Sequence, residues 1–228
     1  MEYYTHEIFP TLVLETVYPD AQNFKDIFFT RVWDYVKEKG ISFEETHNCL
    51  HHEKLFKDLY KFATKSAQEY LNQVKVDHNL FDFNLIKSWL NIIKAKGNIV
   101  HAHYESHLSF VYYVSIPDGM NIPIRFELKQ HQKFIPWHHL YDRATERNAV
   151  NSYHCDFEPV EGKLLVFPSS IYHGAIDLGG DHKGEISNTL DELKQKRISI
   201  AGDFILTYRN TDLHPVGIQP IVNWRRFY

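Results

Sequence analysis

The chain has 228 residues, of which 43% are hydrophobic and 15% aromatic, and its 25 Lys and Arg against 29 Asp and Glu give a net charge of −4. This length is ample for a buried core, and the mildly acidic balance offers no general attraction to nucleic acid or anionic membrane, which bind mainly Lys and Arg. Cys49 and Cys155 are the only cysteines, too few for a disulfide framework, so we expect a reducing compartment and predict a cytoplasmic protein.

The N-terminal part of the chain predicts an extended segment and two helices. Residues 3–17 are rich in β-branched and aromatic side chains, which favours a strand. Apolar residues then recur at steps of three and four from residue 24 to residue 36, which indicates one face of a helix that Gly40 ends. The same spacing predicts a second helix over about residues 52–75.

From about residue 84 the pattern becomes that of strands. Short apolar runs alternate with turn residues, which is typical of a β-sandwich or barrel. Residues 179–196 are polar and charged, and we expect them to form a surface insertion between two strands. The sequence thus predicts a single domain over residues 1–228, of α+β class and mainly β. Residues 1–80 would provide the N-terminal strand and helical support for a β core over residues 84–228.

A histidine-rich segment leads into one of the predicted strands. If the strand is uninterrupted, His101, His103 and Glu105 lie on one face, together with Ser109 and Tyr113. Neutral imidazoles are good ligands for a divalent metal. Taken alone, the pattern also fits a solvent-facing strand with ordinary histidines.

A third histidine and an arginine follow downstream. His173 comes shortly after an apolar strand that Pro168 ends, so it should lie near a strand end. Arg197 and Ser199 alternate along a later strand and share a face. An arginine buried beside a metal-binding patch would need an anionic ligand, because an unpaired buried charge is costly.

In this order the segments resemble a bacterial and phage group of iron(II)/2-oxoglutarate-dependent oxygenases. The resemblance covers most of the chain, including the two N-terminal helices. It implies a double-stranded β-helix, a jelly-roll or cupin-like barrel, with N-terminal packing helices. The matching segments are Trp89-Leu90-Asn91, His101-Ala102-His103, Tyr112-Tyr113, Phe167-Pro168-Ser169 with His173, and Arg197-Ile198-Ser199.

The resemblance also implies an activity and a set of cofactors. Fe(II) would be held by His101, His103 and His173, which leaves open positions for 2-oxoglutarate and O2, with ascorbate as a reductant. Arg197 would bind the distal carboxylate of 2-oxoglutarate. Ser199 and Tyr113 would assist it, and Asn91 would lie near the co-substrate. The expected reaction is hydroxylation of an unactivated C–H bond, with no catalytic side chain beyond the metal ligands.

The sequence leaves a second ligand set open. Most enzymes of the wider superfamily use His-x-Asp/Glu with a distant His, and His103-x-Glu105 matches that pattern. We favour the set that includes His101, because its spacing to Ser106 and Ser109 follows the group. A set with Glu105 would carry one more negative charge.

Two other functions are also open. The chain could be a cupin-like metal protein or three-histidine dioxygenase that does not use 2-oxoglutarate, or an inactive interaction module. We expect a small-molecule or peptide substrate, no nucleic acid and no membrane, since no apolar run approaches the ~18 residues of a membrane span. The sequence does not specify the oligomeric state.

Overall fold

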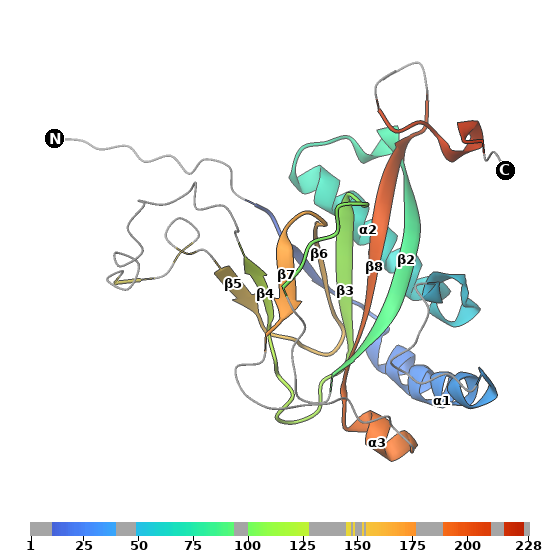
Figure 1. Ribbon diagram of the computed structural model, residues 1–228, viewed down its shortest axis with the longest axis vertical. Helices are drawn as coiled ribbons and strands as arrows, with labels where there is room; N and C mark the ends of the chain where they lie inside the picture. The colour runs from blue at the N-terminus through green and yellow to red at the C-terminus, as the bar shows by residue number, and fades with distance from the viewer. Residues whose placement is uncertain are drawn as a thin grey trace.

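Two antiparallel sheets and two long helices make up the computed structural model (Figure 1). It describes residues 11–39, 49–93, 100–127, 145–146, 148, 152, 154–176, 189–210 and 217–225. The helices are α1 (Ala21–Lys39), α2 (Lys57–Gln73) and the short α3 (Leu190–Lys194). The strands are β1 (Leu14–Val17), β2 (Phe81–Ile93), β3 (Leu108–Ser115), β4 (Ile124–Glu127), β5 (His154–Phe157), β6 (Lys163–Pro168), β7 (Tyr172–Ala175) and β8 (Arg197–Tyr208). Single 3-10 turns lie at Leu50–His52, Lys54–Phe56, His78–Leu80 and Ile221–Asn223.

The larger sheet has five strands in the order β1-β6-β3-β8-β2, and the smaller has three in the order β5-β4-β7. In the larger sheet, β8 pairs with β2 on one side and with β3 on the other. This register places Ser199 of β8 opposite both Asn91 and Tyr113. Side chains from three strands therefore meet on one face of the sheet, since residues directly opposite each other point the same way.

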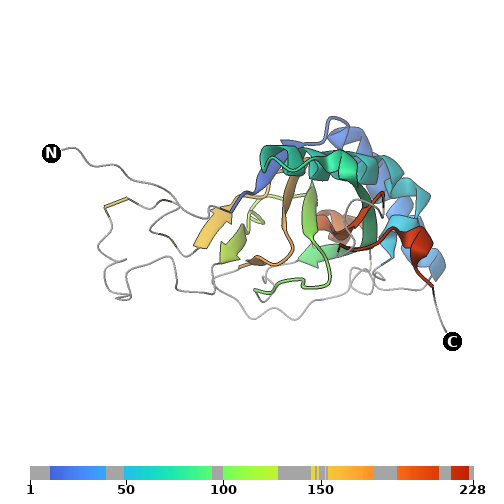
Figure 2. The same ribbon diagram turned by 90° about the horizontal axis from the view of Figure 1, so that it is seen from above.

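Helices α1 and α2 cover the other face of the larger sheet, as Figures 1 and 2 show. Tyr112 of β3 packs edge-on against Phe24 of α1, with ring centroids 5.6 Å apart. Phe110 and Phe204 continue this apolar layer beneath Tyr60 of α2. Among the described side chains, the apolar residues from Phe24 to Trp33 and from Leu55 to Leu71 that join this core therefore form helix faces that pack on the sheet, as the sequence predicts.

The smaller sheet packs near the opposite face through a second apolar cluster. Phe126 of β4 contacts Phe167 of β6 edge-on, with centroids 4.9 Å apart, and Val111 and Tyr113 of β3 join them. All eight residues of β3 are consequently buried. A strand covered on both faces carries apolar side chains on both, which explains the apolar run from Phe110 to Val114 within it.

The structure corrects several sequence predictions. The strand expected from His101 onward begins only at Leu108, because residues 102–107 form a turn-containing connection. The second helix begins at Lys57 rather than near residue 52, since two 3-10 turns precede it. Residues 179–188 of the predicted insertion lie outside the described residues, and α3 follows them. In the described part of the chain, no helix is both long enough and apolar enough to cross a bilayer.

Gly202 of β8 provides a test of this packing. A Cβ atom there would lie 2.6 Å from the ring of Phe110, which is 1% exposed, and 3.0 Å from the carbonyl oxygen of Lys87. We expect Gly202→Ala to lower the free energy of unfolding by about 1–3 kcal/mol through overpacking, measured by urea denaturation. The control Val222→Ala, at a residue 90% exposed, should change it by less than about 0.5 kcal/mol. Equal effects of the two substitutions would contradict this picture of the sheet.

Candidate metal centre

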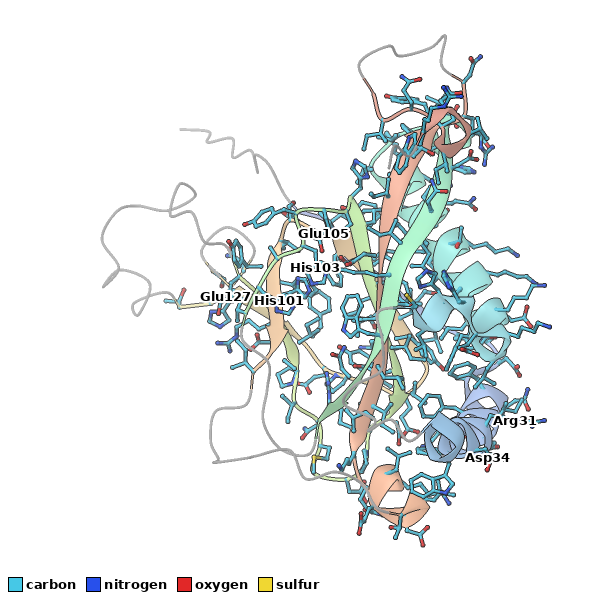
Figure 3. The ribbon with its side chains drawn as sticks, turned by 45° about the vertical axis from the view of Figure 1, so that its right-hand side comes forward. Arg31, Asp34, His101, His103, Glu105 and Glu127 are labelled. Atoms are coloured by element: carbon cyan, nitrogen blue, oxygen red, sulfur yellow. The ribbon has the colours of Figure 1, made fainter. Side chains whose placement is uncertain are left out.

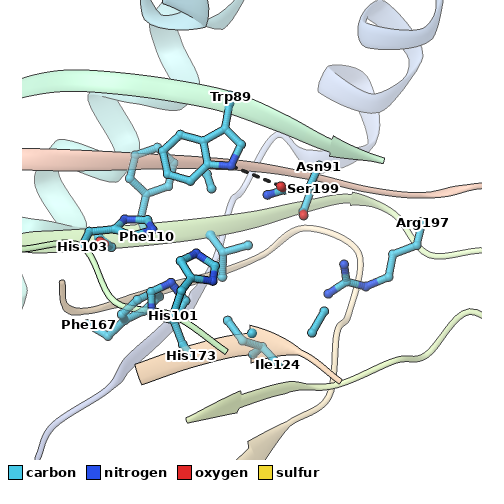
Figure 4. Close-up of a pocket in the computed structure, with 15 residues that line it drawn as sticks. Trp89, Asn91, His101, His103, Phe110, Ile124, Phe167, His173, Arg197 and Ser199 are labelled. Atoms are coloured by element: carbon cyan, nitrogen blue, oxygen red, sulfur yellow. Dashed lines mark hydrogen bonds between the residues drawn. The ribbon is translucent and has the colours of Figure 1, made fainter. Parts of the chain in front are cut away.

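Three histidines from separate segments converge at one end of the space between the two sheets. One potential ligand nitrogen each from His101, His103 and His173 lies within 4.8 Å of the others. The three rings are 4.9–5.2 Å apart between centroids. Figure 3 places His101 and His103 beside each other near β7, and Figure 4 shows all three rings directed toward a shared point.

Backbone hydrogen bonds fix the segments that carry these rings. His101 and His173 form an isolated antiparallel bridge, with N–O distances of 3.0 and 2.8 Å. The backbone N–H of His103 donates to the carbonyl oxygen of Ser169 at 2.8 Å. The histidine pair is thus attached to the β6–β7 connection, so residues some 70 positions apart meet without being neighbours in one regular strand.

Hydrogen bonds to the Nδ1 atoms determine which nitrogen is free in two of the rings. His173 Nδ1 donates to the carbonyl oxygen of Ile171 at 2.9 Å, and His103 Nδ1 donates to Asp203 Oδ1 at 2.8 Å. Both rings therefore retain Nε2 as the nitrogen able to bind a metal. Burial lowers the pKa of His173 to about 4, so this imidazole is neutral near pH 7, the form that coordinates metals.

The donor set fits Fe(II). Imidazole nitrogens suit Fe, Zn, Cu and Ni, and three of them on one side leave positions open for other ligands. Nitrogens that bind one ion at about 2.1 Å in adjacent positions lie roughly 3 Å apart. His101, His103 and His173 are therefore the residues that could hold the metal.

Glu105 lies away from this cluster. Its carboxylate forms an ion pair with Lys87, and its side chain is 56% exposed. The turn after His103 breaks the alternation that would have placed Glu105 on the same face as His101 and His103. The geometry favours the three-histidine set, although the choice of ligands stays a prediction.

Asp203 is a residue of this site that the sequence analysis missed. Its side chain is fully buried, and its Oδ1 accepts hydrogen bonds from His103 and from Ser109 Oγ at 2.6 Å. Burial raises its pKa, but the hydrogen bonds from His103 and Ser109 outweigh this effect, so the pKa lies below its usual value. The alternation Arg197, Ser199, Ala201, Asp203 along one strand was the signal that could have found it.

A cavity of about 290 Å³ extends from the histidines between the sheets. Arg197 lies in its wall with 2% exposure, and Figure 4 shows the guanidinium pointing into the open space. The guanidinium lies over the ring of Tyr113, 5.1 Å from its centroid. Arg197 Nε and the hydroxyl of Tyr113 have no hydrogen-bond partner within the described residues. The cavity is lined by Trp89, Asn91, His101, His103, Ser109, Phe110, Val111, Ile124, Phe167, His173, Gly174, Ala175, Arg197, Ser199 and Ala201.

The cavity therefore contains a buried cation without a protein counterion among the described residues. Burial lowers the pKa of Arg197, which shows the cost of keeping this charge away from water. Burial likewise raises the pKa of Tyr113 to about 12, so its hydroxyl is protonated and can donate a hydrogen bond. An anionic ligand in the cavity would satisfy the guanidinium.

Asn91 and Ser199 lie on the same face as Arg197. Asn91 Oδ1 accepts a hydrogen bond from Trp89 Nε1 at 3.2 Å, which orients its amide (Figure 4). Ser199 is 1% exposed and lines the cavity beside it. The structure thus brings three of the four residues predicted to bind the co-substrate to one cavity wall, with Tyr113 beneath the guanidinium.

The three histidines and the buried arginine are the arrangement expected of a non-haem iron oxygenase, and comparison with a known family agrees. Residues 87–188 match the family model described as "Putative 2OG-Fe(II) oxygenase". This match, over a little under half of the chain, agrees with the resemblance seen in the motifs. The match contains the three histidines and Asn91, and it ends before Arg197. A search of curated protein sequences gives no significant match.

Comparison with solved structures gives matches of low sequence identity. The non-heme alpha ketoglutarate dependent carbocyclase SnoK from nogalamycin biosynthesis gives a TM-score of 0.54 at 8% identity, over 88% of this chain and 83% of that chain. A Pseudomonas putida prolyl-4-hydroxylase gives 0.47 at 14% identity, over 86% and 92%. A 2OG-Fe(II) oxygenase family oxidoreductase from Burkholderia pseudomallei gives 0.35 at 10% identity, over 54% of this chain and only 44% of its own length. SnoK, the one of these three above 0.5, carries the similarity of fold.

The ligand set can be tested by metal titration. We expect His101→Ala, His103→Ala and His173→Ala each to weaken binding of Fe(II), or of Co(II) as a stable substitute, by at least about 100-fold, since each removes one of three ligands. Glu105→Gln should leave the affinity within about threefold, because an exposed ion pair contributes little. Loss of metal on Glu105→Gln with retention on His101→Ala would show that the other ligand set is the true one. The measurement is anaerobic equilibrium dialysis.

Proposed function

We propose that this protein is an Fe(II)- and 2-oxoglutarate-dependent dioxygenase that hydroxylates an unactivated C–H bond. The observation that carries the proposal is the shared cavity. Arg197 presents a buried, unpaired guanidinium to the same space into which His101, His103 and His173 direct their rings. A metal site and an anion site in one cavity suit a co-substrate that is both a chelator and a diacid.

The proposed fold is a double-stranded β-helix supported by N-terminal helices. The five-stranded and three-stranded sheets would be its two halves, with the cavity between them at the open end. Their antiparallel pairing, the similarity to SnoK and the packing of α1 and α2 on the outer face support this assignment.

Different side chains would bind the metal and the co-substrate. The three histidines would hold Fe(II), and Arg197 would bind the distal carboxylate of 2-oxoglutarate through a charge-assisted pair. Tyr113 and Ser199 would donate hydrogen bonds to the same carboxylate, and Asn91 would contact the co-substrate through its amide. When bound, Fe(II) and 2-oxoglutarate together would supply the oxidising power. The reaction would consume O2 and convert 2-oxoglutarate to succinate and CO2.

The apolar walls of the cavity would exclude water around the reacting groups. Trp89, Phe167 and Ile124 surround the histidines and the arginine with hydrocarbon surface. This low-dielectric setting strengthens the ionic contact to Arg197. The substrate, which we propose to be a small molecule or a peptide, would approach from the histidine end.

Turnover of 2-oxoglutarate tests the proposal directly. With Fe(II), ascorbate and O2, the purified protein should form succinate, at least slowly without substrate and faster with a compound that fits the site. Succinate is measured by chromatography, and the His103→Ala protein serves as the control. Metal binding without any succinate across a broad substrate panel would instead support a cupin-like protein that does not use 2-oxoglutarate.

The role of Arg197 has its own test. We expect Arg197→Met to raise the Kd for 2-oxoglutarate by at least about 100-fold, because it removes the charged partner of a buried carboxylate. Arg197→Lys should recover only part of the affinity, since a lysine lacks the planar pair of donors. Metal affinity should be unchanged in both variants. Calorimetric titration of the Co(II)-loaded protein measures these constants, and an unchanged Kd in Arg197→Met would exclude the assigned role.

A further inference from the structure

We infer that Asp203 is a positioning residue that supplies the metal centre with a negative charge through His103. This inference rests on the proposed function, because it concerns the same histidines. The three-histidine set has no anionic ligand. The nearest fully buried carboxylate lies one hydrogen bond behind it, on the Nδ1 side of His103.

The register of three strands places Asp203 there. It lies directly opposite Ser109 on β3 and opposite Lys87 on β2. Ser109 Oγ donates to Asp203 Oδ1 at 2.6 Å, and Ser109 is itself hydrogen-bonded to Ser169 Oγ at 2.9 Å. The backbone carbonyl oxygen of Ser169 accepts from His103, so the same cluster holds this ligand by both its backbone and its ring.

The two oxygens of Asp203 have different partners. Oδ1 faces His103 and Ser109, whereas Oδ2 lies 3.1 Å from Nζ of Lys87 in an ion pair. Lys87 also pairs with Glu105 at the more exposed edge. A chain of alternating charge thus runs from Glu105 through Lys87 to Asp203 and ends at His103. A fully buried carboxylate is tolerable only with such partners, so its charge is stable beside the imidazole.

The consequence for the metal follows from the hydrogen bond. An ionised acceptor on Nδ1 requires the proton to stay on that nitrogen, so His103 always offers Nε2 to the metal. The carboxylate also makes the ring a stronger electron donor to a bound metal, as acceptors behind metal-binding histidines do. Asp203 would therefore partly replace, from outside the coordination sphere, the charge that a carboxylate ligand would bring.

Substitution of Asp203 separates its charge from its shape. Asp203→Asn keeps an oxygen that can accept from His103 but removes the charge, and Asp203→Leu removes both. We expect Asp203→Asn to weaken Co(II) binding about 10–100-fold and Asp203→Leu to weaken it more. The visible absorption of bound Co(II) should shift in Asp203→Asn, which a purely structural role would not cause. The full-length protein is used throughout, with anaerobic dialysis and absorption spectroscopy as the measurements.

Two controls separate this effect from general loss of stability. Thr207→Val removes a buried hydroxyl on the same strand that is hydrogen-bonded to Asn84 at 3.0 Å, and Asp82→Asn removes an exposed carboxylate paired with Arg209 on the same ladder. Both should leave Co(II) affinity within about threefold. Wild-type affinity and an unshifted spectrum in Asp203→Asn would overturn the inference.

A measurement on the wild-type protein covers the case in which the Asp203 variants do not fold. Histidine-ring proton–nitrogen correlation spectra of the Zn(II)-loaded protein should show His103 bound through Nε2, with a slowly exchanging proton on Nδ1. Coordination through Nδ1, or rapid exchange of that proton, would overturn the inference. If the wild-type protein binds no divalent metal, the proposed function itself fails, and that outcome is distinct from an unchanged Asp203→Asn protein.

Discussion

The site of this protein depends on two buried charged side chains on one face of a strand. The chain neutralises one of these charges and not the other. Asp203 and Arg197 lie six residues apart on β8, and both are buried between the sheets. Asp203 has Lys87, Ser109 and His103 as partners. Arg197 has only the face of Tyr113 among the described residues. Because a buried charge needs a counter-charge, Lys87 neutralises Asp203 within the chain, whereas Arg197 requires an anionic ligand.

The fold keeps both charges in place. Helices α1 and α2 exclude water from one face of the larger sheet, and the smaller sheet shields the other. β8 is held between β2 and β3 by ladders on both sides, so a charge on it cannot turn to the surface without breaking the sheet. A rigid strand of this kind suits a site whose ligands and anion-binding group must keep a fixed separation.

The motifs HxH, FPSxxxH and RxS predicted the residues of the site through their resemblance to the oxygenase group, because each motif is only a few residues long. Alternation on a strand put Arg197 and Ser199 on one face, and β8 has that alternation. The same rule failed for Glu105, since a turn follows His103 and the strand starts only at Leu108. A backbone bridge between His101 and His173, and not a continuous strand, brings the histidines together.

The sequence by itself determined the helix faces, the mainly β class and the residue types for an iron and 2-oxoglutarate site, because these depend on periodicity and on motifs of a few residues. Only the tertiary structure decided which of these residues meet. Asp203 shows why, because its partners Lys87, Ser109 and His103 lie 94 or more positions away in the sequence. The spacing of residues within one segment does not predict which distant strands pair. The burial that leaves Arg197 without a counterion has the same origin, because it depends on two sheets and two helices closing around one strand.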